Sequence, residues 1–185
     1  MIKEILSKYK FDVRSDRLGP DCPFTHWRLY FKKKMVKICQ EKFKKFDQSA
    51  EFRAGAYAVY CSKISIGENV IIRPNCMLFA EPRDGEDGKQ GRITIENDVM
   101  MGSGVHIYVS NHRYDIPNLS IIKQGHSEPK SVILKEGCWI GANVIILPGV
   151  VVGRNAVVGA GSIVTRNVED NCIYAGNPAM KIREI

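Results

Sequence analysis

The segment IGANVIILPGVVVGRNAVVGAG, residues 140–161, repeats with a period of six residues and contains too much glycine and proline for a helix. Counting in sixes gives only aliphatic residues: Ile140, Ile146, Val152, Val158 and Val164. A period of six fits neither the 3.6 residues of an α-helix nor the two of a simple strand. It fits a short strand and a turn, repeated, whose stacked coils bury the aliphatic residues in one interior column.

The same spacing occurs twice upstream, in blocks that are out of register with each other and with the first. The aliphatic positions of these blocks are Ile66, Ile72 and Leu78, and then Ile95, Met101 and Ile107. A run of buried strands in a sandwich or barrel would leave the regular placement of glycine unexplained. The sequence therefore predicts a mainly β protein, a parallel β-solenoid interrupted by insertions that are not multiples of six.

The chain is expected to divide into two parts at residue 60. Residues 1–60 lack the repeat and are predicted to form a helical, basic segment, and residues 61–185 the solenoid. Loop insertions are expected at 80–92, AEPRDGEDGKQGR, and at 108–131. The non-repetitive end, NCIYAGNPAMKIREI, is expected to cap the open end of the core. A loop as long as 108–131 is uncommon within a compact repeat unless it has a function.

Composition limits the classes of function. The six cysteines form no C-x-x-C pair, and no histidine stands at metal-ligand spacing, so neither a disulfide framework nor a metal site is expected. The start, MIKEILSKYK, lacks the apolar stretch of a secretory leader, and no run approaches the ~20 apolar residues of a membrane span. We expect a cytoplasmic protein.

Much of the net charge of +7 falls within residues 28–46, RLYFKKKMVKICQEKFKKF, which contain a single glutamate. Apolar residues recur there at helical spacing, and a basic amphipathic helix is predicted from about Phe24 to Phe46. Its apolar face could pack on the end of the solenoid. Alternatively, residues 28–46 could make a peripheral contact with the anionic inner face of a membrane. No nucleic acid is expected as a partner, because no basic groove with interleaved aromatic residues is evident.

The repeat, together with AGNPA near the C-terminus, resembles the hexapeptide repeat of left-handed parallel β-helix acyltransferases. Residues 138–185 are similar to the C-terminal half of the galactoside, maltose and nodulation-factor O-acetyltransferases, and the resemblance extends over about residues 60–185. The N-terminal third resembles, more loosely, bacterial surface-polysaccharide O-acetyltransferases. The resemblance implies acetyl-CoA as co-substrate, a carbohydrate acceptor, and a homotrimer with sites between subunits.

His112, in SNHRYD of the long loop, is the candidate catalytic residue. A loop histidine would by itself be taken as merely exposed, but the resemblance implies a general base at this place. The chemistry requires one, because a sugar hydroxyl must lose its proton as it attacks a thioester, and imidazole titrates near neutral pH. His106 is expected to be a wall residue of the solenoid. No Ser or Cys stands in a nucleophile motif, so direct attack without a covalent intermediate is expected.

Cofactor contacts follow from the resemblance only. When the coenzyme A contacts of the family are transferred to this sequence position by position, they correspond to Trp139, Ala142, Ala160, Thr165, Arg166 and Arg183. Small residues would let the pantetheine arm approach the backbone, the arginines would pair with phosphates, and the Ala142 N–H would stabilise the oxyanion. Met180 departs from the pattern, because relatives can carry arginine there.

The acceptor side is less well defined. Asn75 and Arg73 are approximate counterparts of acceptor-binding residues in relatives. Asp115 could orient His112 or contact the acceptor, and His126 could do either as well. Two charged residues of the first insertion, Asp84 and Glu86, could bind sugar hydroxyls or be solvated.

Three other functions stay open at this point. An antibiotic acetyltransferase of the chloramphenicol or streptogramin type and an amino-sugar N-acetyltransferase would share the fold. A non-catalytic β-helix scaffold would lack the chemistry. The histidine spacing does not resemble a metal-binding β-helix enzyme, and the presence of His112 with a complete C-terminal pattern favours an enzyme.

Overall fold

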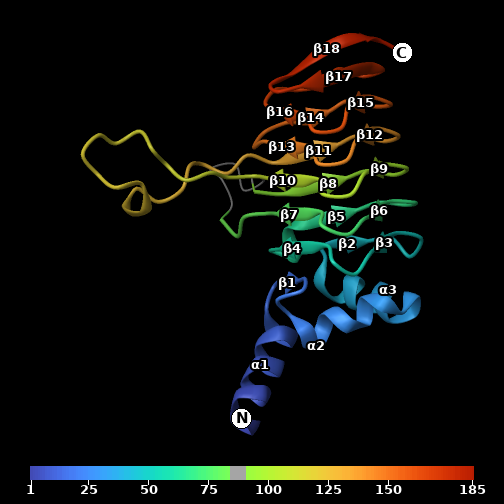
Figure 1. Cartoon of the computed structure of the whole chain (residues 1–185). Helices are drawn as coiled ribbons and strands as arrows, with labels where there is room; N and C mark the ends of the chain where they lie inside the picture. Colours follow the sequence, from blue (N-terminus) through green and yellow to red (C-terminus); the bar gives the residue numbers. More distant parts are fainter. Residues whose placement is uncertain (84–90) are drawn as a thin grey trace.

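Three sheets of mainly parallel strands form the walls of the molecule (Figure 1). In the computed structural model, which describes residues 1–83 and 91–185, each coil adds one strand to sheet B, then sheet C, then sheet A. The helices are α1 (Ile2–Arg14), α2 (Pro23–His26) and α3 (Lys32–Lys42), with 3-10 turns η1 (Trp27–Tyr30), η2 (Cys61–Lys63) and η3 (Ile121–Lys123).

The strands are short. Sheet A contains, in spatial order, β1 (Arg17–Leu18), β4 (Tyr57–Val59), β7 (Met77–Phe79), β10 (His106–Tyr108), β13 (Ile145–Ile146) and β16 (Ile163–Val164). Sheet B contains β14 (Val151–Val152), β11 (Val132–Leu134), β8 (Ile93–Ile95), β5 (Ile64–Ile66) and β2 (Lys45–Phe46). Sheet C contains β18 (Ala179–Glu184), β17 (Cys172–Gly176), β15 (Val157–Val158), β12 (Trp139–Ile140), β9 (Met100–Met101), β6 (Ile71–Ile72) and β3 (Glu51–Phe52).

The aliphatic position of every hexapeptide points into the core. All eleven such residues of the three blocks are at most 3% exposed, from Ile66 to Val164. They form one continuous hydrophobic cluster from end to end of the solenoid. A single two- or three-residue strand could not bury such a face alone, whereas stacked coils bury it against each other. The predicted left-handed parallel β-helix is confirmed.

The turn between sheets C and A, here called the C–A corner, stacks residues in the left-handed backbone region. Asn75, Gly104, Asn143 and Gly161 occupy the same place in successive coils, with φ between 57° and 71°. Asparagine and glycine adopt this conformation at least cost, which explains their sixfold placement. Gly141 is required for a different reason: a Cβ there would lie 2.5 Å from the backbone nitrogen of Ala160 in the next coil.

The solenoid begins earlier than the expected boundary at residue 60. Strands β2, β3 and β4 form a complete first coil that pairs in parallel with the second. Its inward residues are Phe46, Phe52 and Ala58. The six-residue period was not visible here because aromatic residues and alanine replace the aliphatic residues, and no glycine follows them.

The basic segment is not one helix from Phe24 to Phe46, as predicted, but α2, η1 and α3 in succession. The extended backbone of Phe31 separates η1 from α3 (φ −125°, ψ 111°). The apolar side of α3, Met35, Ile38 and Cys39, is buried against the first coil. Of the two hypotheses for this segment, packing on the end of the solenoid is therefore confirmed for α3.

Both insertions leave the solenoid at the same corner, between sheets A and B, in consecutive coils. The first joins β7 to β8, and its residues 84–90, with Asp84 and Glu86, lie outside the described residues. The second joins β10 to β11 and projects far from the body (Figure 1). At the other end, β17 and β18 form an antiparallel hairpin that covers the last coil. No helix in the described part of the chain is long and apolar enough to cross a membrane.

Candidate active site

Two histidines meet where the long loop leaves the solenoid. His112 and His126 form an antiparallel bridge, and their ring centroids are 4.4 Å apart. The backbone N–H of Arg113 donates to the carbonyl of Gly125 at 3.0 Å and continues this pairing. The sequence separated the two histidines by fourteen residues, and the hairpin-like base of the loop brings them together.

A single serine closes the base of the loop. The Ser127 hydroxyl accepts from the N–H of Asn111 at 3.1 Å and donates to the carbonyl of Asn111 at 3.1 Å. The Ser127 N–H donates to the same carbonyl at 2.7 Å. Three hydrogen bonds thus hold the residue before His112 against the residue after His126, which keeps the two histidines side by side.

The histidines line two adjoining open hollows. The smaller, of about 310 Å³, lies against sheet A, and its wall includes Phe79 and Tyr108, which stack with centroids 5.2 Å apart. The larger, of about 580 Å³, lies on the loop side. An apolar aromatic wall beside convergent polar groups is typical of a small-molecule site. His106 lies in the wall strand β10, as expected, with Nδ1 3.3 Å from the Tyr108 hydroxyl.

Glu81 contributes a carboxylate to the smaller hollow. Its side chain is 13% exposed, and it accepts hydrogen bonds from Ser110 at 3.0 Å and Arg83 at 3.1 Å. Burial by itself would raise the pKa of this carboxyl, but the bonds from Arg83 and Ser110 outweigh it and lower the pKa. Sequence reasoning missed Glu81. It stands at the start of the first insertion, where the only signal is an acidic residue directly after a coil strand.

Asp115 pairs with Arg113 rather than with His112. The guanidinium donates to both carboxylate oxygens, at 3.0 and 3.1 Å. These bonds lower the pKa of the Asp115 carboxyl. Asp115 lines the larger hollow with His112 and His126, so of its two expected roles the contact with an acceptor suits its position better than the orientation of the base.

Ala142 and Ala160 lie at the C–A corner, one above the other. A Cβ on Gly102 would lie 2.4 Å from the nitrogen of Ala142, and a Cβ on Gly141 would lie 2.5 Å from that of Ala160. The Gly161 N–H donates to the Ala142 carbonyl at 2.8 Å. Glycine and alanine thus form a strip with no large side chains, along which an extended ligand could lie against the backbone.

Two of the expected acceptor residues lie near this strip, not near His112. Arg73 lines a hollow of about 180 Å³ with Trp139, Met100 and Gly102, and its Nε donates to the Met101 carbonyl at 3.1 Å. Asn75 is exposed at the C–A corner in the left-handed conformation. The turn by itself is enough to explain an asparagine at position 75.

The remaining cofactor candidates are exposed. Thr165 and Arg166 follow β16 at the A–B corner. Arg183 lies on β18 and donates to the Glu184 carbonyl at 2.8 Å, and Met180 is exposed on the same strand. Within one chain, therefore, sheet A separates His112 and Arg166 on one side from Ala142 and Ala160 on the other. Among the described residues no cluster of His, Cys, Asp and Glu could hold a metal ion.

Residues 131–166 match the family model of the bacterial transferase hexapeptide (six repeats). Among solved structures, a galactoside acetyltransferase in complex with coenzyme A is 26% identical over all of this chain and 84% of its own, with a TM-score of 0.74. The polySia-specific acetyltransferase NeuO is 29% identical over 75% of this chain and 59% of its own (TM-score 0.59).

An N-acyltransferase variant from Bacillus cereus, AntD with dTDP-4-amino-4,6-dideoxyglucose and coenzyme A, is 26% identical over 80% of this chain and 87% of its own (TM-score 0.60). No curated protein is significantly similar in sequence. The repeat, the three-sided solenoid and these likenesses agree: residues 131–166 carry the hexapeptide repeat of bacterial transferases, and the chain has the fold of the acetyltransferases to which it is similar.

Proposed function

We propose that the protein transfers the acetyl group of acetyl-CoA to a hydroxyl of a carbohydrate, with His112 as the general base. The observation that carries this proposal is the paired His112 and His126 above an aromatic wall that also presents the Glu81 carboxylate. A sugar offers apolar C–H faces to stack on aromatic rings and hydroxyls for a carboxylate to accept from.

The reaction requires few steps. The acceptor hydroxyl gives its proton to the His112 imidazole as its oxygen attacks the thioester carbonyl, which forms a tetrahedral oxyanion. The Ala142 N–H would donate to that oxyanion. Collapse breaks the carbon–sulfur bond, and the imidazolium returns the proton to the departing coenzyme A thiolate. No covalent enzyme intermediate is required.

Acetyl-CoA would lie along the strip of Ala142 and Ala160. The half-buried Ala142 and the exposed Ala160 support this path, since neither has a side chain larger than a methyl group. Trp139 would flank the arm from sheet C, and Thr165, Arg166 and Arg183 would bind the nucleotide end, the arginines as partners of its phosphates. Thr165 and Arg166 lie across sheet A from the strip, so the neighbouring chain would supply them.

The working form would be a homotrimer with its sites between subunits. Two observations support this arrangement. His112 and the alanine strip lie on opposite sides of sheet A in one chain, so a neighbour must supply one of them. The long loop also exposes large apolar side chains that a neighbour would cover: Tyr114, Ile116, Leu119, Ile121 and Ile122.

The acceptor would be a cell-surface glycan or its precursor, bound by Glu81 and contacted by His126 and Asp115. In a trimer, Arg73 and Asn75 would reach it only from the neighbouring chain. The second candidate is transfer to the amine of an amino sugar, favoured by the likeness to an N-acyltransferase crystallised with an amino-sugar nucleotide. Both reactions use the same cofactor path and differ in the attacking atom.

The test is release of coenzyme A thiol from acetyl-CoA with a panel of oligosaccharides, amino-sugar nucleotides and chloramphenicol. We expect acceptor-dependent release with an oligosaccharide, and a loss of about 10²–10⁴-fold in kcat/KM for His112→Ala. His126→Ala is the matched control, since it removes a ring from the same hollows, and a smaller loss is expected. An unchanged rate in His112→Ala would exclude it as the base, and release with an amine acceptor alone would favour the second candidate.

A further inference from the structure

Helix α1 carries an apolar stripe that is largely exposed in the described part of the chain, where only the Tyr9 ring meets another ring, that of Phe24. Ile2, Ile5, Leu6, Tyr9 and Val13 recur at three- and four-residue spacing on one face, and each is at least 44% exposed. The helix extends beyond the N-terminal end of the solenoid, away from the loop and the cap (Figure 1). A continuous apolar stripe on a water-exposed helix marks a surface for another partner.

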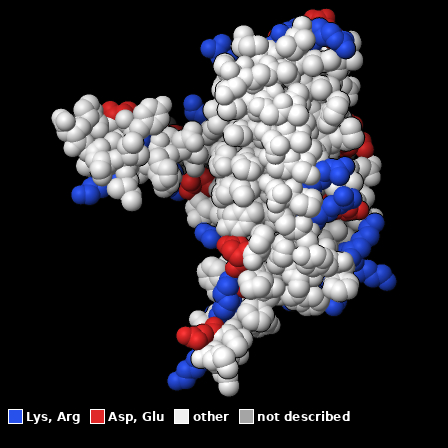
Figure 2. All heavy atoms as spheres, viewed as in Figure 1, with Lys and Arg blue, Asp and Glu red and all other residues white. Residues whose placement is uncertain are grey.

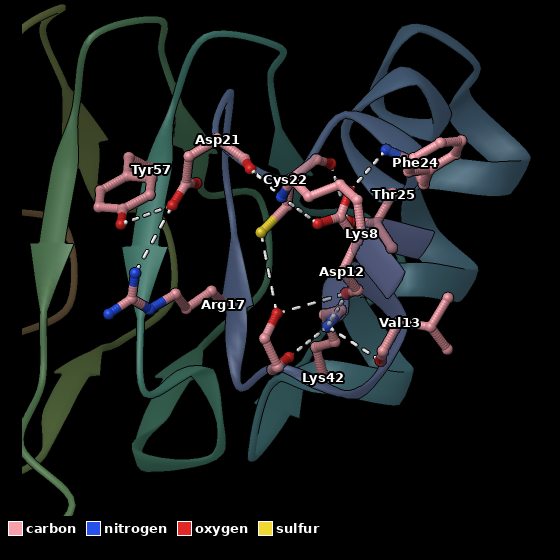
Figure 3. A network of polar contacts seen from close by, with 11 residues as sticks. Lys8, Asp12, Val13, Arg17, Asp21, Cys22, Phe24, Thr25, Lys42 and Tyr57 are labelled. Carbon is pink, nitrogen blue, oxygen red and sulfur yellow. Dashed lines mark hydrogen bonds and ion pairs between the residues drawn. The ribbon is translucent and has the colours of Figure 1, made fainter. Parts of the chain in front are cut away.

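The stripe is outward because α1 is anchored through its polar side (Figure 3). The fully buried Asp12 accepts from the ammonium of Lys8 and, at 2.9 Å, from the N–H of Phe24. Lys42 on α3 donates to the carbonyls of Asp12 and Ser15, at 3.2 and 2.6 Å, at the C-terminal end of α1. These bonds fix the helix to the body and leave most of its apolar face exposed.

The N-terminal end carries the whole net charge of the protein. Residues 1–44 contain twelve Lys or Arg and five Asp or Glu, a net of +7, which equals the net charge of the full chain. Residues 45–185 are therefore neutral overall. In Figure 2 much of the visible solenoid wall is free of charged side chains, whereas basic residues, together with some acidic ones, occur along the N-terminal helices.

A second exposed group lies beside the lysines of α3. Trp27, Tyr30 and Phe31 are between 44 and 71% exposed. The Lys34 ammonium lies 4.4 Å from the Trp27 ring and 5.2 Å from the Phe31 ring. Aromatic rings next to lysine are the side chains that favour the headgroup level of a bilayer.

We propose that this N-terminal end docks on an anionic membrane surface. The stripe of α1 would enter the boundary between headgroups and acyl chains, as amphipathic helices do, and the surrounding cations would bind the negative headgroups. A second copy of the chain fits less well, because its own N-terminal end is equally positive and its solenoid is neutral. An anionic bilayer offers both the apolar layer and the opposite charge.

The contact surface differs from the one expected from residues 28–46. The apolar face of α3 is occupied by the first coil, so α3 contributes only lysines, and the apolar part comes from α1 and the Trp27 group. In a trimer of parallel chains the three N-terminal ends would lie at one pole, so the three stripes could bind one membrane together.

The test is flotation of the protein with vesicles of phosphatidylcholine alone or with added phosphatidylglycerol. The mass of the protein in solution is measured in parallel by light scattering. We expect flotation only with the anionic vesicles, and its loss on going from about 0.1 to about 0.5 M NaCl. The double variant Ile5→Ser/Leu6→Ser should reduce the bound fraction by about tenfold or more, and so should Lys32→Gln/Lys33→Gln/Lys34→Gln.

The matched controls are Ile182→Ser/Ile185→Ser at the opposite pole and Lys123→Gln/Lys130→Gln/Lys135→Gln on the long loop and the coil that follows it. Each removes similar exposed groups and should float like the wild type. The proposal is overturned if the wild type stays unbound with anionic vesicles, or if the α1 variant binds as well as its control. Unbound wild type together with a lower mass for the α1 variant would identify a second copy as the occupant.

Discussion

Glu81 is the residue whose role depends most on its neighbours. Its carboxylate stays ionised because Arg83 and Ser110 donate to it, although burial opposes the charge. We expect Glu81→Gln to raise KM for the acceptor by about tenfold, because one hydrogen bond to a charged group is lost. KM for acetyl-CoA should be unchanged. An equal rise in both KM values would mean that the substitution disturbs the fold rather than the acceptor hollow.

The lowered pKa of Glu81 also sets the sign of its effect on stability. Because the folded protein binds a proton on this carboxyl less readily than the unfolded chain does, the stabilisation is complete above the unfolded pKa. It is lost as the pH falls through the folded pKa. The difference in unfolding free energy between the wild type and Glu81→Gln should therefore shrink as the pH falls from 7 through about 4. Urea unfolding at several pH values measures it, and a difference that grows toward acid would contradict this account.

Coils and turns depend on glycine in two different ways. At position 141 a Cβ would lie 2.5 Å from the backbone of the next coil, so only glycine fits. At position 161 a Cβ would have no atom within 4 Å, but the backbone has a φ of +71°. Gly141→Ala should cost about 1–3 kcal/mol by overpacking, and Gly161→Ala a similar amount by backbone strain of about 1–2 kcal/mol.

Asparagine separates the two causes. Asn75 and Asn143 hold the place of Gly161 in other coils, so Gly161→Asn should regain most of the stability lost in Gly161→Ala. Gly141→Asn should be less stable than Gly141→Ala, because it adds more atoms to the same crowded place. The midpoints of thermal unfolding of the four variants distinguish the two causes. If asparagine restores stability at both positions, backbone strain rather than contact with the next coil is what requires glycine at position 141.

At the base of the long loop, Ser127 acts on His112 only through the backbone of Asn111 and is a positioning residue. Ser127→Ala removes both hydroxyl bonds. We expect a fall in kcat of about tenfold with KM for acetyl-CoA unchanged, as a misplaced base would give. Ser127→Thr, which keeps the hydroxyl, should restore kcat. If the threonine variant is as slow as alanine, the hydroxyl is not what holds the loop.

The sequence period predicted the elements that a repeat controls and little else. Inward residues from Ile66 to Val164, both insertions and the cap could be predicted, because each coil must place an aliphatic residue in the same column. The first coil was missed because Phe46, Phe52 and Ala58 fill that column without the repeat. The pairing of His112 with His126 and the position of Glu81 depend on how loops fold back, which no local pattern encodes. Arg73 and Asn75 were placed by likeness to relatives, and in one chain they lie apart from His112.

At the scale of the whole molecule, the division of the candidate residues across sheet A makes a prediction about assembly. Light scattering should give a mass of the assembly about three times the 20.8 kDa of one chain. Two inactive variants should then complement each other: His112→Ala, which lacks the base, and Ala160→Trp, which blocks the cofactor strip. In mixed trimers some sites would combine His112 from one chain with Ala160 from the next.

In any mixed trimer, one of the three head-to-tail sites, about a third, combines an intact base with an intact cofactor strip. Co-expression of the two variants with different tags, followed by tandem purification of the mixed species, should therefore recover a substantial part of the wild-type thiol release. Mixing the two proteins after each has assembled alone is the control and should recover nothing while the trimers stay intact. If the mixed trimers are as inactive as either parent, the base and the cofactor strip of one site belong to the same chain, and the loop must then reach across sheet A within a single subunit.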